Sequence, residues 1–243
     1  MKLSGKTALV TGGATGIGLG VAVALAREGC RVAIAGRRED KLREAAASYK
    51  GSPPLVYHAA DVGDLKSVED LVAWSNQQLG PLDIVVNSAG VNVLRRTLAE
   101  LSPEDWDLMM RINATGAFYC LRAVLPQMRE RRDGLIVNIS SIAGKRSSLL
   151  GGIGYTASKF AMTATGVTAA REEAQYGIRV TNIYPGEVDT PILEHRPKPV
   201  SAEHRARILK PEDVADAVLM VACLPARAHV PELVIKPTSQ DFF

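Results

Sequence analysis

The chain has 243 residues, and its 29 Lys and Arg against 26 Asp and Glu give a formal net charge of +3. This excess is too small to predict a nucleic acid or an acidic membrane surface as a partner. A hydrophobic fraction of 47% with 23% charged residues is typical of a globular protein. It excludes a disordered, collagen-like or disulfide-scaffold chain.

The three cysteines, Cys30, Cys120 and Cys223, lie far apart without metal-ligand spacing. They predict neither a disulfide framework nor a metal site, and they favour a reducing, cytoplasmic location. The residues before Gly12 contain no uninterrupted apolar stretch of the kind found in a signal peptide. The apolar run Ala217–Leu224 is too short to span a bilayer, so no membrane association is expected.

Short apolar segments alternate with helical patterns along the whole chain, without a linker between them. The expected strands are Thr7–Val10, Arg31–Ala35, Leu55–His58, Leu82–Val86, Leu135–Ile139, Arg179–Ile183 and Leu233–Ile235. The expected helices are Ile17–Glu28, Glu39–Ser48, Leu65–Leu79, a long helix from Ser102 toward Arg131 that Gly134 stops, Tyr155–Gln175, and one after Pro211. This alternation predicts a doubly wound, Rossmann-like α/β fold with about seven parallel strands and helices on both faces.

Two segments, Gly144–Gly154 and Thr190–Lys210, lack a regular pattern and read as loops. Both follow expected strands, and ligands of open α/β sheets bind beyond the carboxyl ends of the strands. We therefore expect these segments to form the wall and the lid of a pocket. The alternative is that they are ordinary solvated loops.

A glycine-rich turn connects the first expected strand to the first helix. Gly12, Gly16 and Gly18 have the spacing G-x-x-x-G-x-G, which allows a pyrophosphate to approach backbone amides and the positive end of the helix. The position of the turn in the first strand–helix unit favours a dinucleotide site. A turn needed only for tight packing is the alternative.

The corner after the second strand bears on cofactor choice. An NAD site usually has a carboxylate there, but this chain has Gly36 followed by Arg37 and Arg38. A guanidinium pairs well with a 2′-phosphate, so NADP(H) is favoured, with NAD(H) as a second option. The alternative is that the two arginines are solvated or pair with Glu39 or Asp40.

Tyr155 and Lys159 are four residues apart on one expected helix and therefore share a face. Ser140 and Ser141 follow the preceding strand, and Asn113 lies in the long helix. A tyrosine with an ordinary pKa of ~10 is a poor base at neutral pH. An ammonium group about 4 Å away could lower that pKa by about three units at an effective dielectric near 20.

Together these motifs resemble the short-chain dehydrogenase/reductase family. The resemblance rests on Thr11–Gly18, Asp61-Val62, Asn87–Gly90, Asn113, Ser140-Ser141, Tyr155-x-x-x-Lys159 and Pro185-Gly186. It implies one domain over residues 1–243, with residues 1–90 mainly binding the dinucleotide. Residues 91–243 would form the catalytic and substrate-binding half, with residues 190–210 as a lid.

The resemblance also implies residue roles. Tyr155 would be the general acid/base, Lys159 the residue that lowers its pKa, Ser141 the carbonyl-orienting hydroxyl and Asn113 the proton-relay residue. Asn87 would stabilise the sheet, Asp61 would contact the adenine, and Thr190 would hold the nicotinamide carboxamide. The implied cofactor-binding set comprises Gly12, Thr15, Gly16, Ile17, Gly18, Arg37, Arg38, Asp61, Val62, Asn87, Ala89, Gly90, Tyr155, Lys159, Pro185, Gly186, Val188 and Thr190.

The expected reaction is NADP(H)-dependent interconversion of a secondary alcohol or 3-hydroxy acid with its ketone or aldehyde. The segment Val230–Gln240 is similar to the NADP-dependent branch that contains 3-hydroxy acid dehydrogenases. Arg95, Arg96, Lys145 and Arg146 near the rim could receive a carboxylate or could be merely solvated. A 3-oxoacyl-acyl-carrier-protein reductase and a non-catalytic NADP(H)-binding sensor or scaffold are the alternatives.

The resemblance also implies a homodimer or homotetramer, in which the helices that contain Asn113 and Tyr155 pair across a two-fold axis. Small residues on the second helix, among them Gly166, Ala169 and Ala170, would permit close approach of another helix. They could equally pack on the sheet.

Overall fold

In a computed structural model, which describes residues 1–241, seven parallel strands form one sheet in the order β3-β2-β1-β4-β5-β6-β7. The strands are β1 (Thr7–Thr11), β2 (Arg31–Gly36), β3 (Val56–Ala59), β4 (Ile84–Asn87), β5 (Gly134–Ile139), β6 (Ile178–Pro185) and β7 (Glu232–Ile235). The chain order reverses between β1 and β4, which places a crevice at the carboxyl ends of these strands. The predicted Rossmann-like fold is confirmed.

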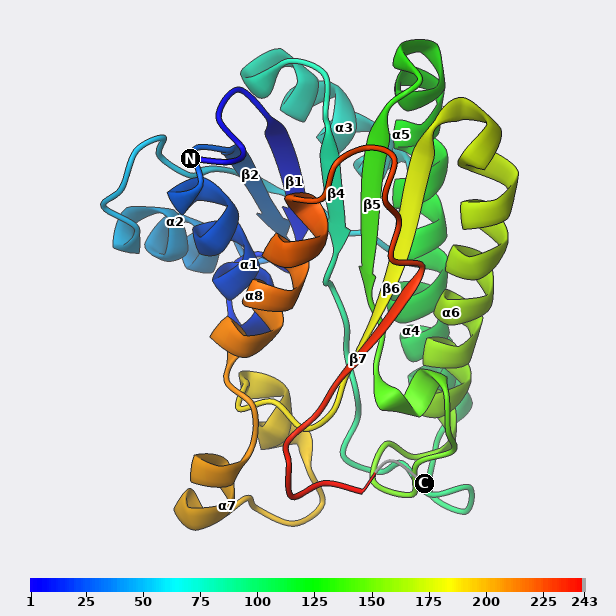
Figure 1. The fold of residues 1–243 in the computed structure, drawn as a ribbon. Helices are drawn as coiled ribbons and strands as arrows, with labels where there is room; N and C mark the ends of the chain where they lie inside the picture. The colour runs from blue at the N-terminus through cyan, green and yellow to red at the C-terminus, as the bar shows by residue number, and fades with distance from the viewer. Residues whose placement is uncertain (242–243) are drawn as a thin grey trace.

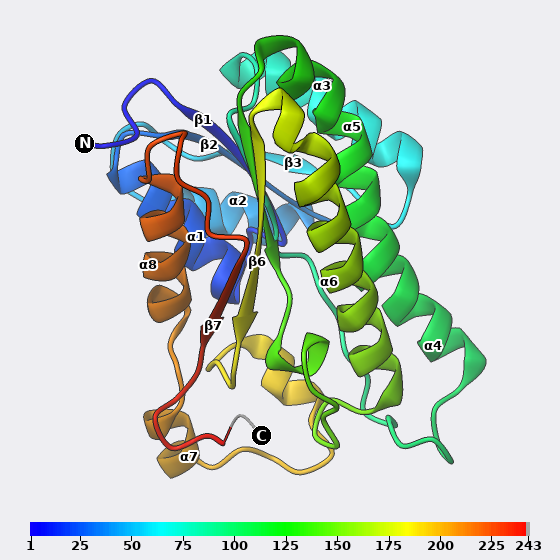
Figure 2. The same cartoon turned by 45° about the vertical axis from the view of Figure 1, so that its right-hand side comes forward.

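Helices cover both faces of the sheet (Figures 1 and 2). One face carries α1 (Gly16–Arg27), α2 (Glu39–Ser48) and α8 (Pro211–Ala222), and the other carries α3 (Leu65–Leu79), α5 (Gly116–Arg131) and α6 (Ile153–Glu173). Each face has its own buried apolar cluster. The central strands β1, β4 and β5 are completely buried between them, which explains their continuous apolar sequences, whereas the edge strands β3 and β7 are only partly buried.

The long helix predicted from Ser102 toward Arg131 is interrupted. It consists of α4 (Pro103–Met109), a π-helical segment (Met110–Thr115) and α5. Such π segments are frequent at functional sites. The helix also ends differently from the prediction, because Arg132 adopts a left-handed conformation with φ of 54° and Gly134 is already the first residue of β5.

The segment 190–210 is not a plain loop, in contrast to its prediction. It contains a short 3-10 helix (Pro191–His195) and α7 (Ala202–Arg207), which begins where the Ser201 side chain accepts a hydrogen bond from the His204 amide. Two further 3-10 helices, Ile142–Gly144 and Ala174–Tyr176, flank α6. Figure 2 shows that the chain around α7 extends below the carboxyl ends of the strands.

A row of buried asparagines crosses the sheet near these carboxyl ends. Asn87, Asn138 and Asn182 lie in register on β4, β5 and β6. The Asn87 amide donates to Asn138 Oδ1 over 2.9 Å, and the Asn138 amide donates to Asn182 Oδ1 over 3.0 Å. We refer to these three residues as the asparagine row.

Every helix within residues 1–241 is too short or too polar to span a bilayer. In the same part of the chain, no three His, Cys, Asp or Glu residues are grouped as a metal ion would require.

Candidate active site

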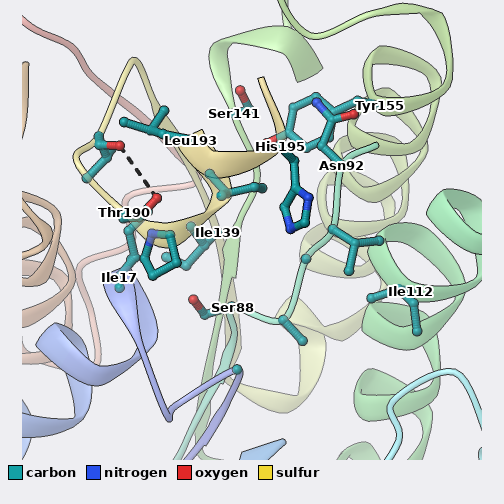
Figure 3. Close-up of a pocket in the computed structure, with 18 of the residues that line it drawn as sticks. Ile17, Ser88, Asn92, Ile112, Ile139, Ser141, Tyr155, Thr190, Leu193 and His195 are labelled. Atoms are coloured by element: carbon teal, nitrogen blue, oxygen red, sulfur yellow. Dashed lines mark hydrogen bonds between the residues drawn. The ribbon is translucent and has the colours of Figure 1, made fainter. Parts of the chain in front are cut away.

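A cleft of about 970 Å³ lies at the carboxyl ends of the strands. It runs from the glycine-rich turn after β1 to the 3-10 helix of segment 190–210. Figure 3 shows Ile17 and Ser88 toward one end of this cleft, and Ser141, Tyr155 and His195 toward the other. The cleft therefore joins the predicted cofactor residues to the predicted catalytic residues.

Close backbone packing requires the glycines of the turn. A Cβ on Gly12 would lie 2.8 Å from Ala89 Cα, and one on Gly18 would lie 2.3 Å from the Gly12 carbonyl oxygen. Helix α1 begins at Gly16, and its first turn contains no acidic residue. The free amides and positive end of this helix therefore face a cleft that can accept an anionic pyrophosphate.

The loop after β4 is tied to this turn by a threonine. Thr11 Oγ1 accepts hydrogen bonds from the amides of Ser88, over 3.2 Å, and Ala89, over 3.3 Å. A Cβ on Gly90 would lie 3.6 Å from Lys159 Nζ, so a larger residue there would occupy the space in front of the lysine. These contacts leave a continuous groove for an elongated ligand.

Arg37 and Arg38 are exposed on the cleft wall directly after β2. Within residues 1–241 neither guanidinium forms an ion pair, so the alternative pairing with Glu39 or Asp40 is not observed. Asp61, after β3, lines the same end of the cleft and pairs with Arg111 over 3.3 Å. This end therefore offers two unpaired positive charges.

Tyr155, in the first turns of α6, and Ser141 both line the cleft, and Figure 3 shows their side chains toward the same end of it. Burial raises the pKa of the Tyr155 phenol, whereas the Ser141 hydroxyl and the charge of Arg96 lower it. The net direction is upward. Burial is the largest of these effects, and the role of Lys159 in lowering the pKa of the tyrosine stays a prediction.

Lys159 is held by the end of a strand. Its Nζ lies 5.7 Å from the centroid of the Tyr155 ring and donates a hydrogen bond to the Ile139 carbonyl oxygen over 2.9 Å. Burial lowers the pKa of Lys159 from 10.5 to about 8. The ammonium group is thus held by the end of β5 rather than by the phenol.

The two serines after β5 have different surroundings. Ser140 is buried, and its Oγ lies 3.3 Å from the Lys159 carbonyl oxygen and 3.2 Å from Thr163 Oγ1. Ser141 is partly exposed, faces the cleft, and accepts a hydrogen bond from the Ala143 amide over 3.1 Å. Of the two serines, Ser141 is the one whose hydroxyl lowers the pKa of Tyr155.

Two predicted site residues lie behind the cleft wall. Asn113, in the π-helical segment, is completely buried, and its side chain bonds both backbone groups of Val91 and the Ser158 hydroxyl. Asn87 belongs to the asparagine row. Both residues position the cleft wall, and the other predicted cofactor residues line the cleft itself, including Thr15, Val62, Pro185, Gly186, Val188 and Thr190.

The four rim cations separate into two pairs. Arg95 and Arg96 line the cleft, whereas Lys145 and Arg146 are outside its lining. Lys145 pairs with Glu232 over 2.7 Å and lies 4.6 Å from the centroid of the Tyr184 ring. The sequence placed Arg96 on the rim, but the structure buries it and directs its charge at Tyr155.

The side chain of His195 was not among the predicted site residues. Figure 3 shows its ring projecting into the cleft from the 3-10 helix Pro191–His195, on the same side as Tyr155 and Asn92. The only sequence signal was its place in a segment expected to form a lid.

Comparisons with known proteins agree with this geometry. The family model for short chain dehydrogenase matches residues 6–200. An uncharacterised oxidoreductase of Staphylococcus saprophyticus is 35% identical over 98% of this chain and 99% of its own length.

Solved structures give the same result. An alcohol dehydrogenase of Thermococcus sibiricus, complexed with 5-hydroxy-NADP, superposes with a TM-score of 0.87 at 31% identity, over 97% of this chain and 98% of that one. A closed serine dehydrogenase complexed with NADP⁺ gives 0.88 at 32% identity, over 97% and 96%. The chain belongs to the short-chain dehydrogenase family and is an oxidoreductase enzyme.

Proposed function

We propose that the protein uses NADP(H) to interconvert a secondary alcohol and its ketone or aldehyde, with Tyr155 as general acid/base. The hydroxyl groups of Tyr155 and Ser141, which both line one end of the glycine-lined groove, carry this proposal. A nicotinamide dinucleotide bound in that groove supplies or accepts the hydride. The residues that the family resemblance assigns to cofactor binding all line this groove, with the exception of Asn87.

In the reductive direction, Tyr155 donates its proton to the carbonyl oxygen as negative charge develops there. Ser141 donates a second hydrogen bond to the same oxygen and thereby stabilises this charge. The raised pKa of Tyr155 keeps the phenol protonated at neutral pH, which suits a proton donor. In the oxidative direction, the deprotonated oxygen of Tyr155 takes the hydroxyl proton of the alcohol, and Ser141 keeps its hydrogen bond to the alcohol oxygen.

Lys159 is proposed to support Tyr155 electrostatically. Its pKa of about 8 lies close to neutral pH, so it can take up and release a proton under ordinary conditions. Asn113 is proposed as a positioning residue that keeps the Val91 backbone in place, because both polar atoms of its amide are already used.

The cofactor assignment rests on the corner after β2. Arg37 and Arg38 are unpaired within residues 1–241, and either can form a charged hydrogen bond with a 2′-phosphate. The similar alcohol and serine dehydrogenases are complexed with NADP forms, which supports NADP(H) for this chain. NAD(H) remains the weaker second cofactor.

A homodimer or homotetramer is also proposed, with α5 and α6 at the interface. Phe118 on α5 and Phe160 on α6 are exposed by 45% and 43%. Exposed apolar groups of this size favour burial in an interface. Light scattering that gives the mass of one chain in dilute solution would overturn this assembly.

A cytoplasmic location is proposed from the thiols. Cys30, Cys120 and Cys223 are all free, and Cys30 and Cys120 are buried in apolar clusters. Free buried thiols are typical of proteins in a reducing compartment.

The test of the function is NADPH oxidation, followed by absorbance, with a panel of ketones, oxo acids, aldehydes and acyl thioesters. Tyr155→Phe is expected to lower the rate by about a hundredfold to ten thousandfold while NADPH still binds. Tyr57→Phe, which removes a hydroxyl on β3 outside the cleft lining, is the matched control. Turnover that survives Tyr155→Phe within about tenfold would contradict the assigned acid/base.

A further inference from the structure

Arg96 is a buried guanidinium without a carboxylate partner. Only 6% of the residue is exposed, although it lines the cleft. Its Nη1 donates to the Leu150 carbonyl oxygen over 3.0 Å, and its Nη2 donates to the His195 carbonyl oxygen. Its Nε is buried and has no hydrogen-bond partner. Five N–H groups are therefore served by two neutral acceptors within the described chain.

A second cation, Arg196, lies near Arg96. Arg196 lies near enough to repel it, and this repulsion together with burial lowers the pKa of Arg96. The nearby carboxylate of Glu187 is already bound by Arg196, over 2.7 Å, and by His204, over 2.8 Å. A buried charge without a counter-ion is unfavourable, and binding of an anionic ligand would compensate it.

Arg96 is also close to the proposed acid/base. The adjacent residues Gly151 and Gly152 pack on the two side chains: a Cβ on Gly151 would lie 3.2 Å from Tyr155 Cδ1, and one on Gly152 would lie 2.6 Å from Arg96 Cβ. The charge of Arg96 acts directly on the Tyr155 phenol. A short ligand could therefore reach both groups, with its anion at Arg96 and its reacting carbon at Tyr155.

We propose that Arg96 binds the carboxylate of a short oxo acid or hydroxy acid and that this contact selects the substrate. The inference rests on the proposed function, because it places the carbonyl of that acid at Tyr155 and Ser141. A carboxylate offers two charged acceptors to the guanidinium and competes well with the two backbone carbonyls it now contacts. The carbonyl of His195 belongs to segment 190–210, so this segment adjusts when the acid binds.

The competing explanation is that Arg96 only braces two loops, since it joins Leu150 to His195. A brace would affect every substrate alike, whereas carboxylate recognition affects only the acid. Acetoacetate and methyl acetoacetate carry the same ketone and differ in charge, so the ratio of their kcat/KM values separates the two explanations.

The kcat/KM values for acetoacetate and for methyl acetoacetate are measured with the wild type, Arg96→Met, Arg96→Lys and Arg43→Met. Arg43 is exposed on α2, outside the cleft lining, and its substitution removes the same charge elsewhere. We expect the wild type to favour the acid, and Arg96→Met to lose about ten- to hundredfold in kcat/KM for it, mainly through KM. The ester should change less than about threefold, and Arg96→Lys should restore part of the preference.

Binding is measured in parallel, by titrating 3-hydroxybutyrate into the NADPH complex and following the cofactor fluorescence. Acid binding that depends on Arg96 without any ketone reduction would support the anion site and contradict the proposed function. Equal losses for acid and ester, or acid binding that is unchanged in Arg96→Met, would overturn the inference while leaving the reductase assignment intact.

Discussion

The ammonium nitrogen of Lys159 lies 2.9 Å from the carbonyl oxygen of Ile139, the last residue of β5. This bond connects α6 to the strand end that precedes the two serines. Lys159 is buried, and its other polar contact is the Met162 sulfur at 3.9 Å. The lysine is therefore placed by the sheet, and its charge is poorly solvated.

Replacing this lysine should stabilise the fold. The pKa of Lys159 falls from 10.5 to about 8 on folding, so the charged form is disfavoured by about 3 kcal/mol near neutral pH. Lys159→Met should raise the free energy of unfolding by up to that amount, measured by urea denaturation, while activity is lost.

The pH dependence of this effect has a defined sign. Between pH about 8 and 10.5 the unfolded chain holds the proton that the folded chain releases, so wild-type stability from this group rises with pH. The advantage of Lys159→Met should shrink over that window and disappear above it. An advantage that stays constant across the window would contradict the assigned shift.

Removing the hydroxyl should affect stability at Ser140 and activity at Ser141. Ser140→Ala deletes buried hydrogen bonds to Lys159 and Thr163 and should lower stability by about 1 kcal/mol. Ser141→Ala deletes the hydroxyl that lines the cleft together with Tyr155 and should lower kcat by about a hundredfold. Denaturation and steady-state rates on both variants check this, and a larger rate loss in Ser140→Ala would reverse the assignment.

Cofactor preference should depend on the corner after β2. Arg37→Ser combined with Arg38→Ser removes both unpaired charges and should reduce kcat/KM with NADPH by about ten- to hundredfold. The value with NADH should change little, because NADH lacks the 2′-phosphate. A parallel loss with both cofactors would show that the arginines serve the fold or the pyrophosphate instead.

Gly166 of α6 packs directly on the asparagine row. A Cβ there would lie 2.2 Å from Asn182 Oδ1 and 2.6 Å from Asn138 Nδ2. Gly→Ala usually stabilises a helix by about 1 kcal/mol, but Gly166→Ala should destabilise this protein by about 1–3 kcal/mol through overpacking. Ala164→Gly, exposed on the same helix, should cost only the helix-propensity difference. Thermal denaturation of both variants measures these changes in stability, and a stabilised Gly166→Ala would refute the close packing.

The strand and helix pattern could be predicted because both faces of the sheet are covered. Strands buried on both sides have continuous apolar sequences, and α2 and α3 have the predicted bounds Glu39–Ser48 and Leu65–Leu79. The π-helical segment could not be predicted. Its residues fit an ordinary helix pattern, and the contact that Asn113 in this segment makes with Val91, which is distant in sequence, is not visible in that pattern.

The site residues could be located because each follows a strand or shares a helix face, and such positions converge at one sheet edge. The burial that raises the pKa of Tyr155 and the contribution of Arg96 to that pKa could not be predicted, because both depend on how the loops fold over the phenol. A basic residue in a loop sequence gives no sign of burial. Arg96 therefore had the same sequence signal as the exposed Arg95.

The asparagine row has a consequence for how this protein can be altered. A shift of one residue in the register of β4, β5 or β6 would leave buried side-chain amides without hydrogen-bond partners. The asparagine row therefore fixes the register of these three strands near their carboxyl ends. The loops that start from those ends are free of this constraint. Exchanging segment 190–210 for one of different sequence should therefore change which molecules are accepted while the reacting hydroxyl groups keep their places, which makes the segment a natural target for redesign of substrate choice.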